Sequence, residues 1–270
     1  SKATPRQMSS VWNKIVGQHK AVERLQQLAI NNVHAFLFIG PEGCGKEDAA
    51  RAFASVLITG SDNENSREAD LITRGAFADV VEVLREGAAV DKDDAEEIIR
   101  LASTTPTESN VKVVIIHEVH LMRDSAAARL LKTIEEPSEK VIFILLADQL
   151  VPSLATINSR CVVVNFMRLT NDIISETLCN EGVEQSVAIA AANVAAGNLP
   201  RARLLAADER LAHRQEAFAS VPYRLDGAGS TVGVSRGLRV ALSAARVDGG
   251  DVVASTPAPC GDGLLRYRLG

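Results

Sequence analysis

Short apolar runs alternate with amphipathic segments through the first two thirds of the chain. Five runs rich in Val, Ile, Leu and Phe predict strands that are covered on both faces, at 34–39, 79–83, 111–116, 141–146 and 161–166. Four segments of helical periodicity lie around them, at 19–30, 46–57, 91–102 and 124–136, and Pro137 stops the last one. This alternation predicts a parallel sheet with helices on both faces, and the sheet domain closes near Arg168.

The last third of the chain has two other patterns. From Thr170 to about Ala219 the strand signal disappears and Ala, Leu and Glu dominate, which predicts a small all-helical domain of two to four helices. Beyond Val221 glycines and prolines become frequent and only 238–247 is a plausible helix, which is typical of a poorly ordered segment. We therefore expect an α/β domain at 1–168, a helical domain at 169–220 and a truncated or disordered tail at 221–270.

The composition fits a globular chain, because 46% of its 270 residues are hydrophobic and 23% are charged. No segment reaches the roughly 18 consecutive apolar residues of a membrane span, and no secretory signal is evident. We expect a soluble, cytoplasmic protein with no membrane partner. The four cysteines include no C-x-x-C pair, so neither a disulfide framework nor a zinc site is expected. A net charge of -5 argues against a protein that coats nucleic acid through charge alone.

A glycine-rich loop follows the first predicted strand and precedes a predicted helix. Its sequence is Gly40-Pro41-Glu42-Gly43-Cys44-Gly45-Lys46-Glu47. In this setting backbone N–H groups and the helix N-terminus can surround a phosphate while the lysine neutralises it. Gly40, Gly43, Gly45 and Lys46 are therefore candidate nucleotide-binding residues. The alternative is a tight turn between strand and helix that needs glycines for its geometry alone.

The residues that should hold magnesium are altered at two separate places. Glu47 stands where a Ser or Thr hydroxyl would bind Mg²⁺, and Glu42 and Asp48 add two more acids that we expect to face Lys46. Two like charges about 4 Å apart repel by roughly 4 kcal/mol at an effective dielectric constant near 20, so Glu47 obstructs MgATP.

The strand at 111–116 ends in His117 and Glu118, where P-loop ATPases carry Asp-Glu. Glu118 is retained, whereas histidine is a poor ligand for Mg²⁺. His117 and His120 have no evident third ligand for zinc. We expect no bound metal, no ATPase activity of the chain's own and no cofactor, or at most weakly bound ATP.

Several motifs occur in an order that is specific to one family. They are Val16-Gly17-Gln18, the stretch from His34 to Pro41, Leu130-Leu131-Lys132-Thr133-Ile134-Glu135-Glu136-Pro137, Ser159-Arg160-Cys161 and Gly197-Asn198-Leu199-Pro200-Arg201-Ala202. Together they cover about 16–206, and the chain resembles the AAA+ clamp loader subunits of bacterial DNA polymerase III. The resemblance implies an AAA+ P-loop domain with a five-stranded parallel sheet, followed by a small all-helical lid domain.

The resemblance also implies roles for two arginines. In this family the arginine of the Ser-Arg-Cys motif reaches the γ-phosphate of ATP on a neighbouring subunit, which assigns an arginine finger to Arg160. A guanidinium offers fixed donors and a permanent charge to such a phosphate. Arg201 matches the lid arginine that senses nucleotide in the subunit's own site, and a structural role for Arg201 remains open beside that one.

Two kinds of family member fit the motifs. The gamma/tau motor subunit should have an intact ATP site, whereas the site of the delta-prime subunit is often degenerate, and Glu47 and His117 favour the second kind. The implied partners are the gamma/tau and delta subunits, the sliding clamp and, indirectly, primed DNA during replication. An active AAA+ ATPase of the motor type and a sensor that binds ATP without hydrolysis through Lys46 and Arg201 remain alternatives.

Two departures from the family pattern bear on these expectations. Many relatives carry a four-cysteine zinc module that 58–78 lacks, so we expect a polar loop there. Relatives also end in a helical collar of well over a hundred residues, and the tail at 221–270 would be a remnant of it.

Overall fold

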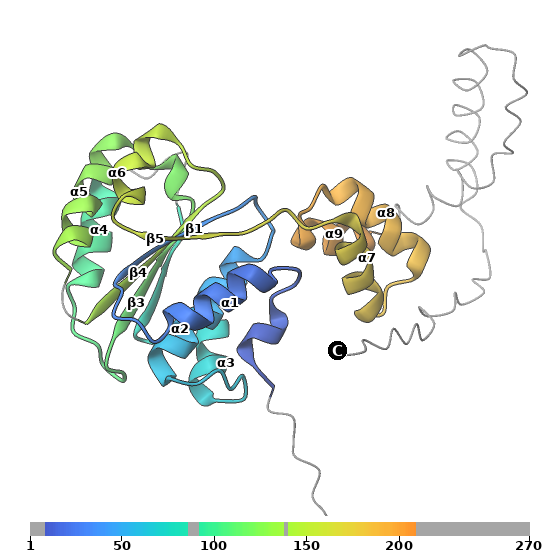
Figure 1. Cartoon of the computed structure of the whole chain (residues 1–270), viewed down its shortest axis with the longest axis horizontal. Helices are drawn as coiled ribbons and strands as arrows, with labels where there is room; N and C mark the ends of the chain where they lie inside the picture. The colour runs from blue at the N-terminus through green and yellow to red at the C-terminus, as the bar shows by residue number, and fades with distance from the viewer. Residues whose placement is uncertain (1–8, 86–91, 138–139, 209–270) are drawn as a thin grey trace, which may run out of the picture. The chain divides into compact units, whose positions relative to one another are not determined.

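The computed structural model describes residues 9–85, 92–137 and 140–208 (Figure 1). The chain divides into two compact units, with the boundary between Arg168 and Leu169. The tail that the sequence analysis places at 221–270 lies outside the described residues, as does the expected end of the helical domain from 209 onwards. Within the described ranges, no helix has both the length and the apolar character that crossing a membrane requires.

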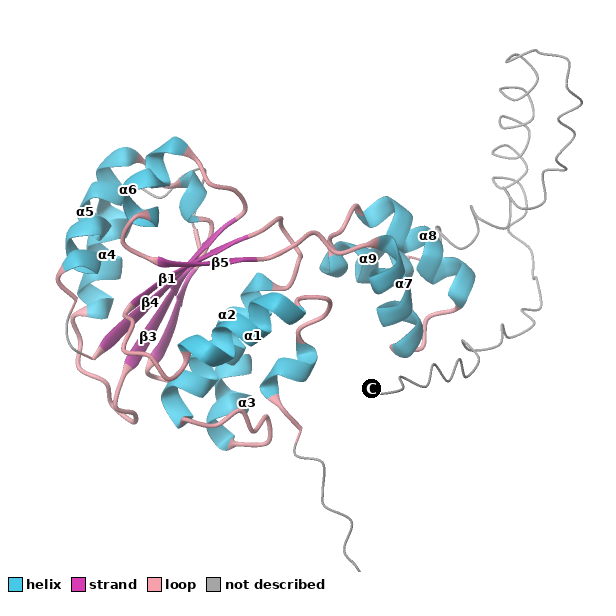
Figure 2. Ribbon diagram, viewed as in Figure 1, coloured by secondary structure: helices cyan, strands magenta, loops and turns pink. Residues whose placement is uncertain are grey.

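The first unit is built on a five-stranded sheet in which every pairing is parallel (Figure 2). The strand order is β2-β3-β4-β1-β5, so β1 is flanked by β4 and β5. The strands are β1 Ala35–Ile39, β2 Val80–Val83, β3 Lys112–Ile116, β4 Val141–Ala147 and β5 Val162–Asn165. The predicted α/β fold with five parallel strands is confirmed, and each boundary lies within two residues of the predicted one.

Helices cover both faces of this sheet (Figure 2). One face carries the 3₁₀ helix η1 Val11–Lys14 and the helices α1 His19–Leu28, α2 Lys46–Thr59 and α3 Arg67–Thr73. The other face carries α4 Lys92–Ala102, η2 Val119–Leu121, α5 Asp124–Glu135, η3 Pro152–Leu154 and α6 Ala155–Asn158. The strands are largely apolar because successive side chains point to opposite faces and both faces are covered by helices; the polar residues within them are Glu82, Lys112 and Asn165.

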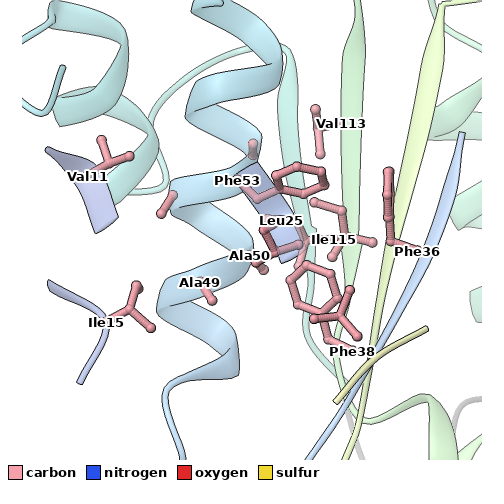
Figure 3. Packing of buried hydrophobic residues seen from close by; sticks show 14 of the residues in the cluster. Val11, Ile15, Leu25, Phe36, Phe38, Ala49, Ala50, Phe53, Val113 and Ile115 are labelled. Carbon is pink, nitrogen blue, oxygen red and sulfur yellow. The ribbon is translucent and has the colours of Figure 1, made fainter. Parts of the chain in front are cut away.

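The core around α2 shows this alternation directly. Phe36 and Phe38 point from β1 towards α2, where Phe53 packs edge-on against Phe36 with ring centroids 4.9 Å apart (Figure 3). Leu37, between the two phenylalanines, belongs instead to the cluster under α4 and α5. Aromatic pairs of this geometry add about 0.5–1.5 kcal/mol to the burial of their area. The packing fixes the helix that begins at Lys46 against β1.

The expectation of a polar loop across 58–78 is wrong, because α3 lies within it. Ser66 caps this helix, and its Oγ accepts a hydrogen bond from the backbone N–H of Ala69 at 3.1 Å. Ala69 and Ile72 are the only residues of α3 that are buried. A helix of seven residues with two buried positions is too short for a clear apolar period, so the sequence pattern did not reveal it.

The described part of the second unit contains three helices, in agreement with the predicted helical domain. They are α7 Asn171–Asn180, α8 Gln185–Ala195 and α9 Leu199–Ala206. A side chain caps each N-terminus: Thr170, Glu184 and Asn198 accept a backbone N–H from the first turn of α7, α8 and α9. Pro200 occupies the first turn of α9, where its missing N–H costs nothing.

Candidate functional site

The glycine-rich loop joins the end of β1 to the start of α2 at the carboxyl edge of the sheet. Gly43 and Gly45 have φ angles of 71° and 94°, which other residues rarely adopt. Gly40 has a different constraint, because a Cβ on it would lie 2.6 Å from the Cβ of Phe166. All three predicted glycines are therefore required by backbone geometry and packing, whether or not the loop holds a phosphate.

Gln18 anchors this loop to the chain that follows β5. Its side chain is buried, and Nε2 donates to the carbonyl of Cys44 at 3.0 Å and to that of Met167 at 2.6 Å. Its Oε1 accepts a hydrogen bond from the backbone N–H of Met167 at 3.0 Å. Because one side-chain amide satisfies three backbone groups, the Val16-Gly17-Gln18 motif has a clear structural role.

Lys46 lies at the centre of the loop and is only 2% exposed. Its Nζ contacts Asp148 Oδ1 at 2.8 Å, Glu47 Oε1 at 3.1 Å and the carbonyl oxygen of Pro41 at 3.4 Å. Burial by itself would lower the pKa of Lys46, but the hydrogen bond to Asp148 and the charge of Glu47 outweigh it and raise the pKa. The ammonium group is therefore charged and surrounded by acceptors from its own chain.

The prediction of which acidic residues face Lys46 is partly wrong. Glu47 contacts the lysine as expected, but Asp48 pairs with Arg51 at 3.4 Å and Glu42 is exposed without contacting Lys46. The second carboxylate comes instead from Asp148, which directly follows β4. The reason is topological, because β4 is the neighbour of β1 in the sheet and its carboxyl end lies beside the loop.

At the second of the two altered metal-holding positions, an ion network ties His117 to the sheet and to α2. His117 Nε2 lies 3.2 Å from Glu82 Oε2, and Arg51 donates to both oxygens of Glu82 at 2.6 and 2.8 Å. Burial raises the pKa of Glu82, but the hydrogen bonds from His117 and Arg51 lower it to about 2. The network joins β2, β3 and α2 at the place where a P-loop ATPase carries its metal-side aspartate.

Glu118, the retained acid, is also engaged within the chain. It has a φ of 51°, uncommon for a residue other than glycine, and its carboxylate pairs with Arg85 at 3.1 Å. His120 accepts a hydrogen bond at Nδ1 from the backbone N–H of Asp148 at 3.2 Å. His117 and His120 thus have different partners, and the described residues contain no group of three side chains that could hold a metal ion.

Arg160 lies in the exposed turn between α6 and β5. Its Nε pairs with Glu135, and its Nη1 donates to the carbonyl of Thr156 at 3.0 Å and to Ser159 Oγ at 3.1 Å. A guanidinium has five N–H donors. Three of them are used in these contacts, and none of the described residues accepts a hydrogen bond from the two on Nη2.

The sheet separates Arg160 from the glycine-rich loop of its own chain. Arg160 precedes β5, whereas the loop follows β1, and β1 and β5 are parallel neighbours. Val162 pairs with Phe36 and Asn165 with Ile39, so the two sites lie beyond opposite ends of strands that span roughly 10 Å at about 3.3 Å per residue. The fold does not bring Arg160 together with Lys46.

Arg201 belongs to the second unit and lies in the first turn of α9. Its backbone N–H donates to Asn198 Oδ1 at 2.9 Å, and its side chain is exposed. Nothing in these contacts assigns a role to its guanidinium, so the expectation that it senses nucleotide stays a prediction.

Several residues of these networks were given no role from the sequence, and four of them carry a charge close to the predicted site residues: Asp148, Glu82, Arg51 and Glu135. A usable signal existed for Asp148 alone, since an acid two residues past a predicted parallel strand lies at the ligand-binding edge of the sheet. The other three lie within strands or helices, where a charged residue is ordinarily a solvated one.

Comparison with known proteins places this geometry in a family. Residues 17–170 match the sequence profile described as DNA polymerase III, delta subunit. The DNA polymerase III subunit tau of Bacillus subtilis is 36% identical over 172 residues, covering 60% of this chain and 30% of the relative. The subunit delta' of the same organism is 32% identical over 181 residues, covering 63% of this chain and 55% of the relative. The chain therefore spans about half or less of the length of these two curated relatives.

Solved structures support the same fold at low sequence identity. A DNA polymerase III gamma-subunit-related protein of Thermotoga maritima superposes with a TM-score of 0.52 at 19% identity, covering 75% of this chain and 63% of that one. A variant of Thermotoga maritima RuvB gives a TM-score of 0.51 at 17% identity, covering 86% of this chain and 72% of that one. The resemblance inferred from the motifs is confirmed, and the chain belongs to the DNA polymerase III delta subunit family.

Proposed function

We propose that this chain is a clamp loader subunit of bacterial DNA polymerase III that supplies Arg160 to ATP bound by a neighbouring ATPase subunit during DNA replication. Its own nucleotide site is degenerate in this proposal. The subunit acts with gamma/tau and delta subunits, while the assembly opens a sliding clamp and places it on primed DNA.

The hydrogen-bond donors of the Arg160 guanidinium are the main support for this proposal. Glu135, Thr156 and Ser159 engage three N–H groups and hold the guanidinium in place, while both N–H groups of Nη2 are left for an acceptor outside the described residues. Two fixed donors on one nitrogen suit phosphate oxygens whose negative charge increases in the transition state. The sheet separates Arg160 from the loop of its own chain, which supports a phosphate supplied by another subunit.

The side chains around the chain's own glycine-rich loop also support a subunit that does not hydrolyse ATP itself. Lys46 is occupied by Asp148 and Glu47, and His117 stands where a metal-side carboxylate is needed. Relatives named tau and delta' match this chain with similar identity, so family membership does not choose between them. The choice of a delta-prime-like role over a motor role rests on these side chains.

The experiment compares Arg160→Ala with Arg100→Ala in a complex reconstituted with gamma/tau and delta subunits, sliding clamp and primed DNA. Arg100 is a matched control, since it is an exposed arginine paired with a single glutamate, Glu97. We expect Arg160→Ala to slow hydrolysis at the interface it serves by roughly 10³-fold or more, the range of an arginine finger. Arg160→Lys should not rescue the rate, because an ammonium group cannot donate in the same fork. A stimulated ATPase rate unchanged by Arg160→Ala would refute the finger.

The motor-type alternative makes a different prediction for the isolated chain. A working ATPase would hydrolyse MgATP without partners and would lose this activity in the Lys46→Ala variant. We expect no turnover by the wild-type chain, and turnover that depends on Lys46 would replace the proposal with that alternative.

A further inference from the structure

Every donor of the Lys46 ammonium group is already matched by an acceptor of the same chain. An ammonium has three N–H groups, and the acceptors around Nζ are Asp148 Oδ1, Glu47 Oε1 and the carbonyl of Pro41, at 2.8, 3.1 and 3.4 Å. A phosphate that enters the loop would have to displace at least one of them. The two carboxylates also carry the same charge sign as the phosphate.

Asp148 is the more firmly held of the two acids. Glu47 is the neighbour of Lys46 in the first turn of α2, and among the described residues its partly exposed side chain is held there by its contact with the lysine alone. Asp148 comes from the end of β4, and its backbone N–H donates to His120 Nδ1 at 3.2 Å. Its other oxygen, Oδ2, lies 3.6 Å from His120 Nε2, so η2 and β4 together fix the position of the carboxylate.

The position of these acids matches the electrostatic preference of the loop. The N-terminus of α2 carries unpaired N–H groups and the positive end of the helix dipole, which favour an anion. In a nucleotide-binding loop a phosphate occupies this field. Here Glu47 lies in the first turn and Asp148 lies next to Lys46, so carboxylates of the chain provide the negative charge.

We propose that Asp148 closes the glycine-rich loop to phosphate by holding Lys46, and that this residue determines whether the loop binds a nucleoside triphosphate. The loss of the magnesium-binding positions would then abolish hydrolysis, while Asp148 separately blocks binding. Since it concerns the degenerate site, the inference rests on the proposed function, but it does not depend on Arg160.

The test measures binding of fluorescent ATP to the full chain by equilibrium titration, once with EDTA and once with Mg²⁺. Asp148→Asn keeps the shape of the side chain and removes its charge, and Asp148→Thr serves as a second variant should the first fail to fold. Asp172→Asn is the matched control, because Asp172 is an exposed acid in the first turn of α7 and its loss changes the net charge equally. Thermal melting confirms that each variant is folded.

We expect Asp148→Asn to bind ATP at least about tenfold more tightly than the wild type, since one nearby like charge is removed from a partly screened site. Asp172→Asn should bind as the wild type does, and adding Lys46→Met to Asp148→Asn should remove the gain. The inference is overturned if folded Asp148 variants bind no better than the wild type, or if Asp172→Asn gains as much. Either of these results leaves the role of Arg160 untouched. Hydrolysis of MgATP by the isolated wild-type chain would instead refute the proposed function.

Discussion

Replacement of Glu82 by Gln tests the ion network around His117, the second altered metal-holding position. Glu82 lies on β2, accepts two hydrogen bonds from Arg51 of α2 at 2.6 and 2.8 Å, and lies 3.2 Å from Nε2 of His117. Only 14% of its side chain is exposed, so water screens these contacts weakly. Gln keeps the size of the side chain and removes the charge that holds Arg51 and His117.

The magnitude follows from the pKa of this carboxyl. Burial raises it, but the hydrogen bonds from His117 and Arg51 lower it from the ordinary 4.5 to about 2. Because a pKa change of one corresponds to about 1.4 kcal/mol, the network contributes about 3 kcal/mol to the free energy of unfolding at neutral pH. A carboxyl with a lowered folded-state pKa stabilises fully above its unfolded pKa. The contribution is therefore lost as the pH falls from about 4.5 towards 2, and less than half of it is left at pH 3.

Urea denaturation of the wild type and of Glu82→Gln at several pH values between 7 and 3 measures this contribution. We expect the variant to be less stable by about 3 kcal/mol at pH 7, and the difference to fall by about half or more at pH 3. Glu97→Gln is the control, because Glu97 forms a single exposed ion pair with Arg100 and such pairs contribute little. The reasoning fails if Glu82→Gln matches the wild type at pH 7, or if the difference is the same at pH 3.

Two further substitutions test the packing that positions the loop and the sheet. Gly40→Ala would place a Cβ 2.6 Å from the Cβ of Phe166, so we expect a loss of about 1–3 kcal/mol in urea denaturation; wild-type stability would show that the loop can move aside. Asp79 is buried and accepts backbone N–H groups from Thr107, Glu108 and Ser109 at 2.6–2.8 Å. We expect Asp79→Asn to cost about 1–3 kcal/mol and to speed amide hydrogen exchange at 107–109, and unchanged exchange there would contradict this role.

The hydrophobic pattern of the sequence predicted those strands and helices whose apolar residues recur with a clear period. The five strands are largely apolar, and α2 and α5 each begin at the predicted residue, so their positions agree with the sequence analysis. The helix α3 was missed, since only Ala69 and Ile72 among its residues are buried. Where a helix is held by a cap and two contacts, periodicity has too few positions to detect it.

In the candidate site, too, only some of the residues could be predicted from the sequence. The glycines and Lys46 are adjacent in sequence and were identified together, whereas Asp148 is 102 positions from Lys46 and meets it only because β4 pairs with β1. Glu82 and His117 are likewise brought together by the pairing of β2 with β3. Long-range ion pairs depend on strand order, and the sequence predicts strand order less directly than it predicts strands.

The glycines of the loop determine its backbone shape, whereas the charged side chains around it bear on what it can bind. Gly43 and Gly45 supply backbone conformations that the turn needs, and Gly40 supplies the space that Phe166 requires. These demands persist without a ligand, because Gln18 satisfies the neighbouring backbone groups and carboxylates neutralise Lys46. A glycine-rich loop of this shape can therefore be retained for folding alone. Under the proposal made for Asp148, the side chains that reach the lysine decide what such a loop binds, and in this chain the one that follows β4 is an aspartate.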